Sequence, residues 1–132
     1  MFSKIFDDSD KFESAPPKTF PGKLTKFLYH RFEAFKGDME KGLVMLPVEL
    51  IDDNGIMLKK CVMQFIDLWN LGEDFKNWVE NACVFTSTLV DRIITGYPKA
   101  TEKEEWEKLG YEDRIMVTGE PFALWVIESE KD

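Results

Sequence analysis

Two short stretches of the chain place polar, chemically competent side chains at the ends of apolar segments. The first runs from Pro47 to Asp52 and follows the apolar run Gly42 to Pro47. Ligands of open α/β sheets gather at the C-terminal ends of strands, so Glu49 and Asp52 are candidates for pointing into a crevice. The simpler interpretation, which the sequence alone favours, is that Asp52 caps the next helix and Glu49 is solvated.

The second stretch, Thr86 to Arg92, ends an apolar, β-branched segment with two adjacent charges. Asp91 and Arg92 are costly to bury there unless they are paired or used. Arg92 offers a two-pronged donor for a sugar hydroxyl or a carboxylate. A structural ion pair at the end of the strand is an equally good interpretation.

Other chemistries have no pattern to support them. The eight glycines are scattered, and none of them forms GxGxxG or GxxxxGK[ST]. His30 is the only histidine and lies in a helical pattern, which predicts a surface or partly packed residue and no metal site. No serine lies in a GxSxG turn, so a hydrolase is disfavoured. We therefore predict no catalytic residue and no metal ligand, and the cofactor-binding residues stay unknown.

Composition narrows the classes of partner. The 132 residues carry a formal net charge of -8, and 44% of them are hydrophobic. A globular chain this acidic is repelled by phosphate backbones and anionic bilayers, so we expect no nucleic acid and no membrane partner. Cys61 and Cys83 show no CxxC spacing, and the N-terminus has no signal-type apolar region. These features predict a reducing, cytoplasmic location.

The order of apolar patterns predicts an α/β layer structure with some parallel pairing. Residues 1–22, rich in proline and small polar residues, are expected as an extended lead-in, and residues 23–132 as one domain. Helices are expected from Lys23 to Gly37, after Asn54-Gly55, around Trp78, and from Thr101 to Leu109, where Thr101 and Glu104 suggest a capping box. Strands are expected at these ranges: 42–47, 84–95, 115–117 and 122–127.

Five motifs, in order along the chain, resemble the tagaturonate reductases (altronate oxidoreductases) of the mannitol dehydrogenase, or polyol-specific long-chain dehydrogenase, family. The resemblance covers nearly everything from Lys11 to Glu128. The motifs are Lys11 to Leu28, Gly42 to Gly55 (GLVMLPVELIDDNG), Leu89 to Pro98 (LVDRIITGYP), Leu109 to Asp113 (LGYED) and Gly119 to Glu128 (GEPFALWVIE).

The resemblance implies a partial Rossmann-like, three-layer α/β unit with a small mixed or mostly parallel sheet of about three to four strands and about four helices. It implies NAD-dependent reduction of tagaturonate to altronate in hexuronate breakdown, with a sugar-acid substrate. The family's glycine fingerprint lies upstream of the matched stretch, and its catalytic lysine lies in a C-terminal domain downstream. No catalytic base is carried over, and we expect no tight NAD binding by this chain alone.

The resemblance also assigns possible substrate contacts. Ser87 matches a position where the wider polyol dehydrogenases place an asparagine that holds the substrate oxygen, although a serine hydroxyl is shorter. Asp91 and Arg92 match the VDR motif, and Glu49 matches a PCELID-type motif. The motif usually has a cysteine where this chain has Val48.

Two hypotheses follow, and whether the chain is itself an enzyme stays open. The first is an interior segment of a tagaturonate reductase-like enzyme, inactive alone. The second is a stand-alone, non-catalytic relic that binds a partner or a sugar acid, motivated by the Met1 start and by the replacements at Val48 and Ala123. Either hypothesis predicts exposed apolar surface that favours self-association. A small interaction module unrelated to enzymes would leave the ordered motifs unexplained.

Overall fold

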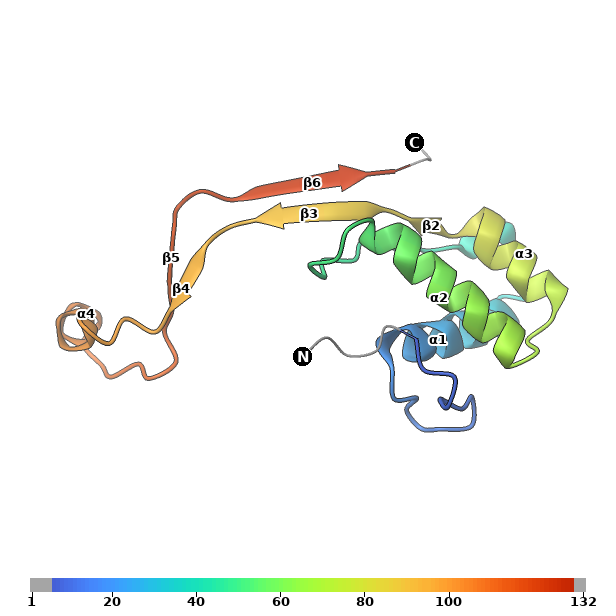
Figure 1. Ribbon diagram of the computed structural model, residues 1–132, viewed down its shortest axis with the longest axis horizontal. Coiled ribbons are helices and arrows are strands. Elements are labelled where there is room, and N and C mark those ends of the chain that lie inside the picture. Colours follow the sequence, from blue (N-terminus) through green and yellow to red (C-terminus); the bar gives the residue numbers. More distant parts are fainter. Residues whose placement is uncertain (1–5, 130–132) are drawn as a thin grey trace. The chain divides into compact units, whose positions relative to one another are not determined.

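The computed structural model describes residues 6–129, which form two compact units (Figure 1). The first unit contains residues 6–88 and 127–129, and the second is Leu89–Val126. Four α-helices are present in the described residues, and α1, α2 and α3 belong to the first unit. That residues 23–132 form one folding domain stays a prediction.

Helix α1 (Phe20–Ala34) begins three residues before the predicted start at Lys23. The backbone N–H of Gly22 donates to the Thr19 hydroxyl at 3.1 Å, so Thr19 satisfies one of the orphan donors of the first turn. Pro21 lies in that turn, where its fixed φ suits the helix and its missing N–H costs nothing. The lead-in is therefore shorter than expected because the helix starts at its cap.

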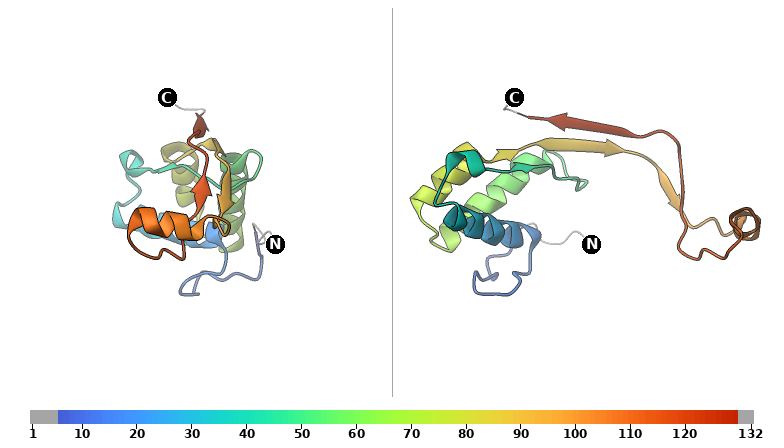
Figure 2. Two further views of the ribbon diagram at one scale, coloured as in Figure 1. Left: turned by 90° about the vertical axis from the view of Figure 1, so that its left-hand side faces the viewer. Right: turned by 180° about the vertical axis from the view of Figure 1, so that it is seen from behind.

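Helices α2 (Asn54–Leu68) and α3 (Glu73–Ala82) pack with α1 around one apolar core (Figure 2). Most apolar side chains at helical spacing on α2 and α3 are buried, while Phe27 on α1 and Phe35 at its C-cap remain exposed. The core is formed by residues of the three helices, of β1 and of the C-cap of α3: Leu28, Met45, Leu58, Val62, Ile66, Phe75, Trp78, Val79 and Cys83.

Two tryptophan side chains join the helices to the segments before η1 and before α1. The Trp78 indole N–H donates to the carbonyl of Asp38 at 2.8 Å, which holds the short 3-10 helix η1 (Met39–Lys41) against α3. The Trp69 indole donates to the carbonyl of Asp10 at 3.0 Å. The indole N–H of each tryptophan is therefore hydrogen-bonded at the edge of the core, while the rest of the ring packs on apolar side chains.

The strands form three two-stranded sheets. Strands β1 (Val44–Met45) and β2 (Val84–Phe85) are parallel, and β3 (Ser87–Asp91) pairs with β6 (Leu124–Glu128), as Figure 1 shows. The α/β class with four helices and small mixed sheets is confirmed. Among the described residues the strands form three separate pairs and not one sheet, and the β1–β2 ladder ends before Pro47, which has no N–H to continue it.

In the second unit, β4 (Ile94–Gly96) pairs antiparallel with β5 (Thr118–Gly119), and α4 (Glu102–Leu109) lies between them in the chain. The strand predicted at 115–117 is wrong, since the pairing begins at Thr118. Thr101 precedes α4 as predicted but makes no side-chain cap hydrogen bond, so the capping box is not formed.

A buried carboxylate organises the segment before α1. Asp10 is only 3% exposed and accepts from the backbone N–H groups of Lys11, Lys18 and Thr19 at 2.9 to 3.1 Å. The Thr19 hydroxyl also donates to it at 2.8 Å, and the same hydroxyl caps α1. Burial alone would raise the pKa of Asp10, but these four donors outweigh it and hold the pKa below its ordinary value.

We predict that Asp10→Asn lowers the free energy of unfolding by about 2 kcal/mol at neutral pH, because an amide places donors against donors. The folded-state pKa lies below the unfolded value of about 3.9, so the stabilisation is fully present above that pH. It is lost as the pH falls through the folded pKa. Urea denaturation of both proteins between pH 7 and pH 2 measures this difference.

Asp8→Asn is the matched control, since Asp8 is exposed in the same segment. A loss of stability equal for both variants, or a difference that persists unchanged at the lowest pH, would contradict the assigned role.

Candidate functional site

The first residue of α2 ties together the two stretches that the sequence marks as candidates. Asn54 is 4% exposed, and its amide nitrogen donates to the carbonyls of Glu49 at 3.0 Å and Thr88 at 2.9 Å. Its amide oxygen accepts from the Thr88 backbone N–H at 2.9 Å. Asn54 therefore pairs with β3 as a neighbouring strand would, while it also fixes the loop after β1.

The next residue brings the backbone of α2 close to the segment between β2 and β3. A Cβ atom on Gly55 would lie 2.0 Å from the carbonyl oxygen of Thr86. Only glycine allows this approach. Thr86 is itself buried, and both its backbone N–H and its hydroxyl donate to the carbonyl of Met45, which extends the β1–β2 ladder by one residue.

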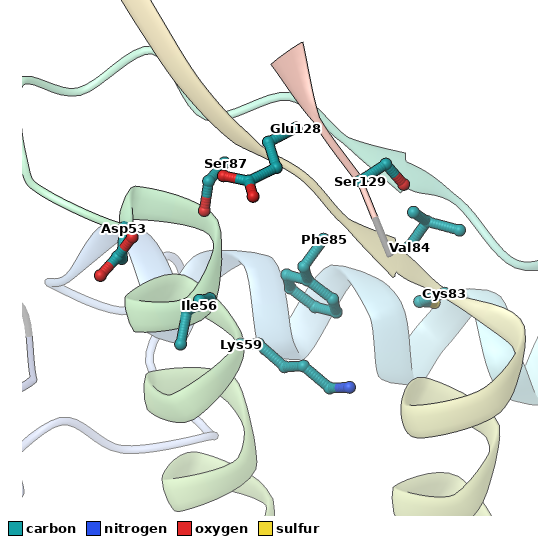
Figure 3. A pocket seen from close by; sticks show the side chains of 9 residues that line it. All are labelled: Asp53, Ile56, Lys59, Cys83, Val84, Phe85, Ser87, Glu128 and Ser129. Carbon is teal, nitrogen blue, oxygen red and sulfur yellow. The ribbon is translucent and has the colours of Figure 1, made fainter. Parts of the chain in front are cut away.

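Beside this junction lies a pocket of about 330 Å³ within the first unit (Figure 3). Its apolar side is formed by β2, with Phe85 at the centre, and by Ile56 of α2. Its polar groups come from α2, from the start of β3 and from the end of β6: Asp53, Lys59, Ser87, Glu128 and Ser129. Cys83 and Val84 complete the lining.

The pocket combines an aromatic ring, one ammonium group, two carboxylates and hydroxyl groups. Lys59 and Asp53 both project from α2, and Glu128 lies next to Ser87 (Figure 3). Aromatic rings offer an apolar face to a ligand, and hydroxyls and carboxylates take hydrogen bonds from its polar edge. Such a lining suits a small hydroxylated molecule with an anionic end near Lys59.

Ser87 lines this pocket, whereas the other candidate in the first unit is held elsewhere. Glu49 is exposed, and its carboxylate accepts from the backbone N–H of Leu50 at 3.3 Å. The predicted cap at Asp52 is wrong: the N-cap of α2 is Asp53, at φ +51°, and it makes no side-chain cap bond. The Asn54 side chain instead bonds back to the loop that precedes α2, at the carbonyls of Pro47 and Glu49.

The second unit holds the remaining two candidates. Asp91 is exposed at the end of β3, and Arg92 donates from Nε to the carbonyl of Glu120 at 3.1 Å. The alternative of an Asp91–Arg92 ion pair is not formed among residues 6–129, because neighbouring side chains of an extended segment point to opposite faces. Arg92 and the following Ile93, whose N–H donates to the Glu120 carboxylate at 2.7 Å, are anchored to the same residue. The substrate roles of Glu49, Ser87, Asp91 and Arg92 stay predictions.

The start of α2 does not offer a cradle for the pyrophosphate of a dinucleotide. That group needs a glycine-rich turn whose N–H donors stand open before a helix. The one glycine at the start of α2, Gly55, is packed against the backbone at Thr86, so the space is filled by the protein itself. Within residues 6–129, no group of three His, Cys, Asp or Glu side chains is arranged as a metal site. No helix in that range is both long and apolar enough to cross a membrane.

Comparison with known proteins decides the family. Residues 16–132 match the mannitol dehydrogenase Rossmann domain. The chain belongs to this family. It is 51% identical over 127 residues to the altronate oxidoreductase of Phocaeicola vulgatus and 48% identical over 124 residues to that of Bacillus subtilis. The alignments cover 96% and 94% of this chain but 26% of each relative, so the chain spans about a quarter of their length.

Two solved dehydrogenase structures share the fold of this chain. The mannitol 2-dehydrogenase of Pseudomonas fluorescens, solved as a ternary complex with NAD and D-mannitol, matches with a TM-score of 0.66 and 25% identity. The match covers 85% of this chain and 22% of that one. A D-sorbitol dehydrogenase in substrate-free form matches with a TM-score of 0.63 at 20% identity, which bears on the fold alone.

The site contains residues that sequence reasoning missed. Asn54 was read only as turn chemistry, yet it holds both candidate stretches. Its partners on β3 are 34 positions away, and no local pattern marks such a pair. Lys59 lies on α2 and Asp53 is its N-cap. Their helical neighbours give no hint that β2 and β6 supply the opposite wall.

We predict that Asn54→Ala lowers the free energy of unfolding by about 2–4 kcal/mol, because it leaves the partly buried N–H and C=O of Thr88 without this partner. Asn77→Ala, on the exposed side of α3, should change it by less than about 0.5 kcal/mol. Chemical denaturation followed by far-UV circular dichroism compares the two. Equal effects would show that Asn54 has no special role.

Proposed function

We propose that this chain is the part of an altronate oxidoreductase-type enzyme that carries substrate contacts, and that it does not transfer hydride on its own. The observation that supports this most strongly is the near-complete alignment of the chain with altronate oxidoreductases at about half identity. The reaction in question is the NADH-dependent reduction of tagaturonate to altronate, in the cytoplasmic breakdown of hexuronates.

The cofactor belongs to the rest of such an enzyme. NAD is present in the solved mannitol 2-dehydrogenase that shares this fold, and the start of α2 in this chain is closed to a pyrophosphate because Gly55 packs against the backbone at Thr86. We therefore propose that this chain by itself binds NADH weakly or not at all. Its contribution to the reaction is to supply contacts to the sugar acid, and the candidates are Ser87 and Glu49 in the first unit and, separately, Asp91 and Arg92 in the second.

We predict that the purified chain oxidises NADH with tagaturonate no faster than a buffer blank, as followed by absorbance of NADH. The full-length altronate oxidoreductase of Bacillus subtilis, assayed beside it, serves as the positive control. Turnover by the chain within a few orders of magnitude of an ordinary enzyme, roughly 1–1,000 per second, would overturn the proposed inactivity.

A second candidate function is the binding of a sugar acid without catalysis, which the pocket at Phe85 favours. Lys59 supplies the single cationic group of the lining, suited to the carboxylate of an aldonic acid such as altronate. Phe85 offers a flat apolar face to the carbon chain, while Ser87 and Glu128 offer hydrogen bonds to hydroxyls.

We predict that altronate binds this pocket and that Lys59→Met weakens the binding about tenfold or more, since a charged hydrogen bond is worth about 1.5–3 kcal/mol. Lys60→Met is the matched control, because Lys60 is the neighbouring lysine on α2 and does not line the pocket. Titration by NMR chemical shifts, with D-altritol as an uncharged analogue, measures the effect. Equal weakening by both substitutions, or no shift at Phe85, would contradict this site.

A further inference from the structure

The charges that line the pocket at Phe85 are not balanced. One ammonium group, that of Lys59, lines the pocket together with the carboxylates of Asp53 and Glu128. At neutral pH the lining therefore has more negative than positive charge. A ligand whose only charge is a carboxylate is attracted by the ammonium group but repelled by both carboxylates.

Within the described residues, the protein does not neutralise these three groups itself. None of the ion pairs formed among residues 6–129 includes Lys59, Asp53 or Glu128. Asp53 is the N-cap of α2, yet its side chain makes no cap hydrogen bond there. Opposite charges that meet in one pocket without pairing to each other can each take an oppositely charged group of a ligand.

The ring of Phe85 separates the opposite charges. It packs against the apolar core of the first unit and also lines the pocket. In Figure 3 it lies between the ammonium end of Lys59 and the carboxylate of Glu128. The ring offers an apolar surface to a carbon chain that runs between the two charges, and its face attracts a cation as well.

We propose that this pocket binds a zwitterionic acid, in which a short hydroxylated carbon chain carries a carboxylate at one end and an ammonium group at the other. The carboxylate pairs with Lys59, the chain crosses Phe85, and the ammonium group pairs with Glu128. The negative charge of Asp53 adds to the attraction for the ammonium group. The volume of about 330 Å³ accommodates an acid of about six carbons.

This preference rests on the second candidate function, because it takes the same pocket as a binding site and adds the chemical class that the site prefers. An uncharged hydroxyl can also donate to Glu128, so an aldonate fits the lining as well. A hydroxyl leaves the excess negative charge in place, whereas an ammonium group neutralises it. The difference in affinity between a terminal hydroxyl and a terminal ammonium group therefore decides.

Two acids that differ only in this group test the preference: D-gluconate and 6-amino-6-deoxy-D-gluconate. Titration of the chain with each acid, followed by NMR chemical shifts, gives the two dissociation constants. The amino compound should bind about fivefold more tightly at low ionic strength, which is the effect of one well-formed exposed ion pair. The difference should shrink in about 0.5 M salt, because Asp53 and Glu128 are exposed and salt screens their charge.

The outcomes separate this preference from the binding site itself. Tighter binding of the amino compound, with shifts at Phe85 and Ser87, supports it. Equal affinities, or tighter binding of D-gluconate, overturn the preference and leave sugar-acid binding in the pocket intact. If neither acid binds, the preference is overturned, and the altronate titration shows whether the second candidate function falls with it.

A single substitution tests the group that pairs with the ammonium. Glu128→Gln should reduce the fivefold preference to about twofold or less, because it removes one of the two carboxylates. Glu80→Gln is the matched control, since Glu80 is an exposed glutamate of α3 that does not line the pocket, and it should keep the preference. An equal preference in the two variants contradicts the role of Glu128.

A double substitution tests the charge balance as a whole. With Asp53→Asn and Glu128→Gln together, Lys59 is the only charged group of the lining, so D-gluconate should bind more tightly than the amino compound. Asparagine accepts the φ of +51° at position 53, so the start of α2 is not strained. Far-UV circular dichroism checks that the helices are kept. A preference for the amino compound that persists in this variant overturns the proposal.

Discussion

The amide of Asn54 is the contact on which the arrangement of the first unit depends. One side chain bonds both backbone groups of Thr88 and the carbonyls of Pro47 and Glu49 in the loop after β1. Backbone groups buried between a helix and a sheet must find partners, and a strand would normally supply them. Here the Asn54 side chain takes the place of a strand. The edge of β3 at Thr88 is therefore paired although no strand lies beside it there.

The position of the pocket follows from the same contact. With Asn54 bound to Thr88 and Gly55 pressed against Thr86, the first turn of α2 lies directly over the start of β3. That placement brings Asp53 and Lys59 of the helix to the same cavity as Ser87. Asp53 and Lys59 therefore line the same pocket as the distant Ser87, because the start of α2 is held by the Asn54–Thr88 bonds and by the packing of Gly55 on Thr86.

The sequence predicts the existence of the helices better than their starts, because the apolar period marks α2 and α3 while the caps of α2 and α4 differ from the predicted ones. Cys61, Val62 and Phe65 are buried on α2 as their spacing indicates. The sheet was harder, since strand pairing depends on contacts between distant residues. A run such as Gly42 to Pro47 shows that a strand exists but not that only Val44 and Met45 pair. The polar pairing of Asn54 with Thr88 has no local signature, and the pocket walls could not be assembled without it.

The Asn54-Gly55 step also bears on how the protein ages. Asparagine followed by glycine is the dipeptide most prone to lose its amide, because the small glycine lets its own N–H attack the asparagine side chain. In this fold the amide is fully engaged with Pro47, Glu49 and Thr88, and Gly55 is locked into a helix. Chemical damage there requires the start of α2 to open first. Deamidation would place an aspartate carboxylate against the three carbonyl oxygens that now accept from the amide. The rate of deamidation at Asn54 therefore reports how often the start of α2 opens.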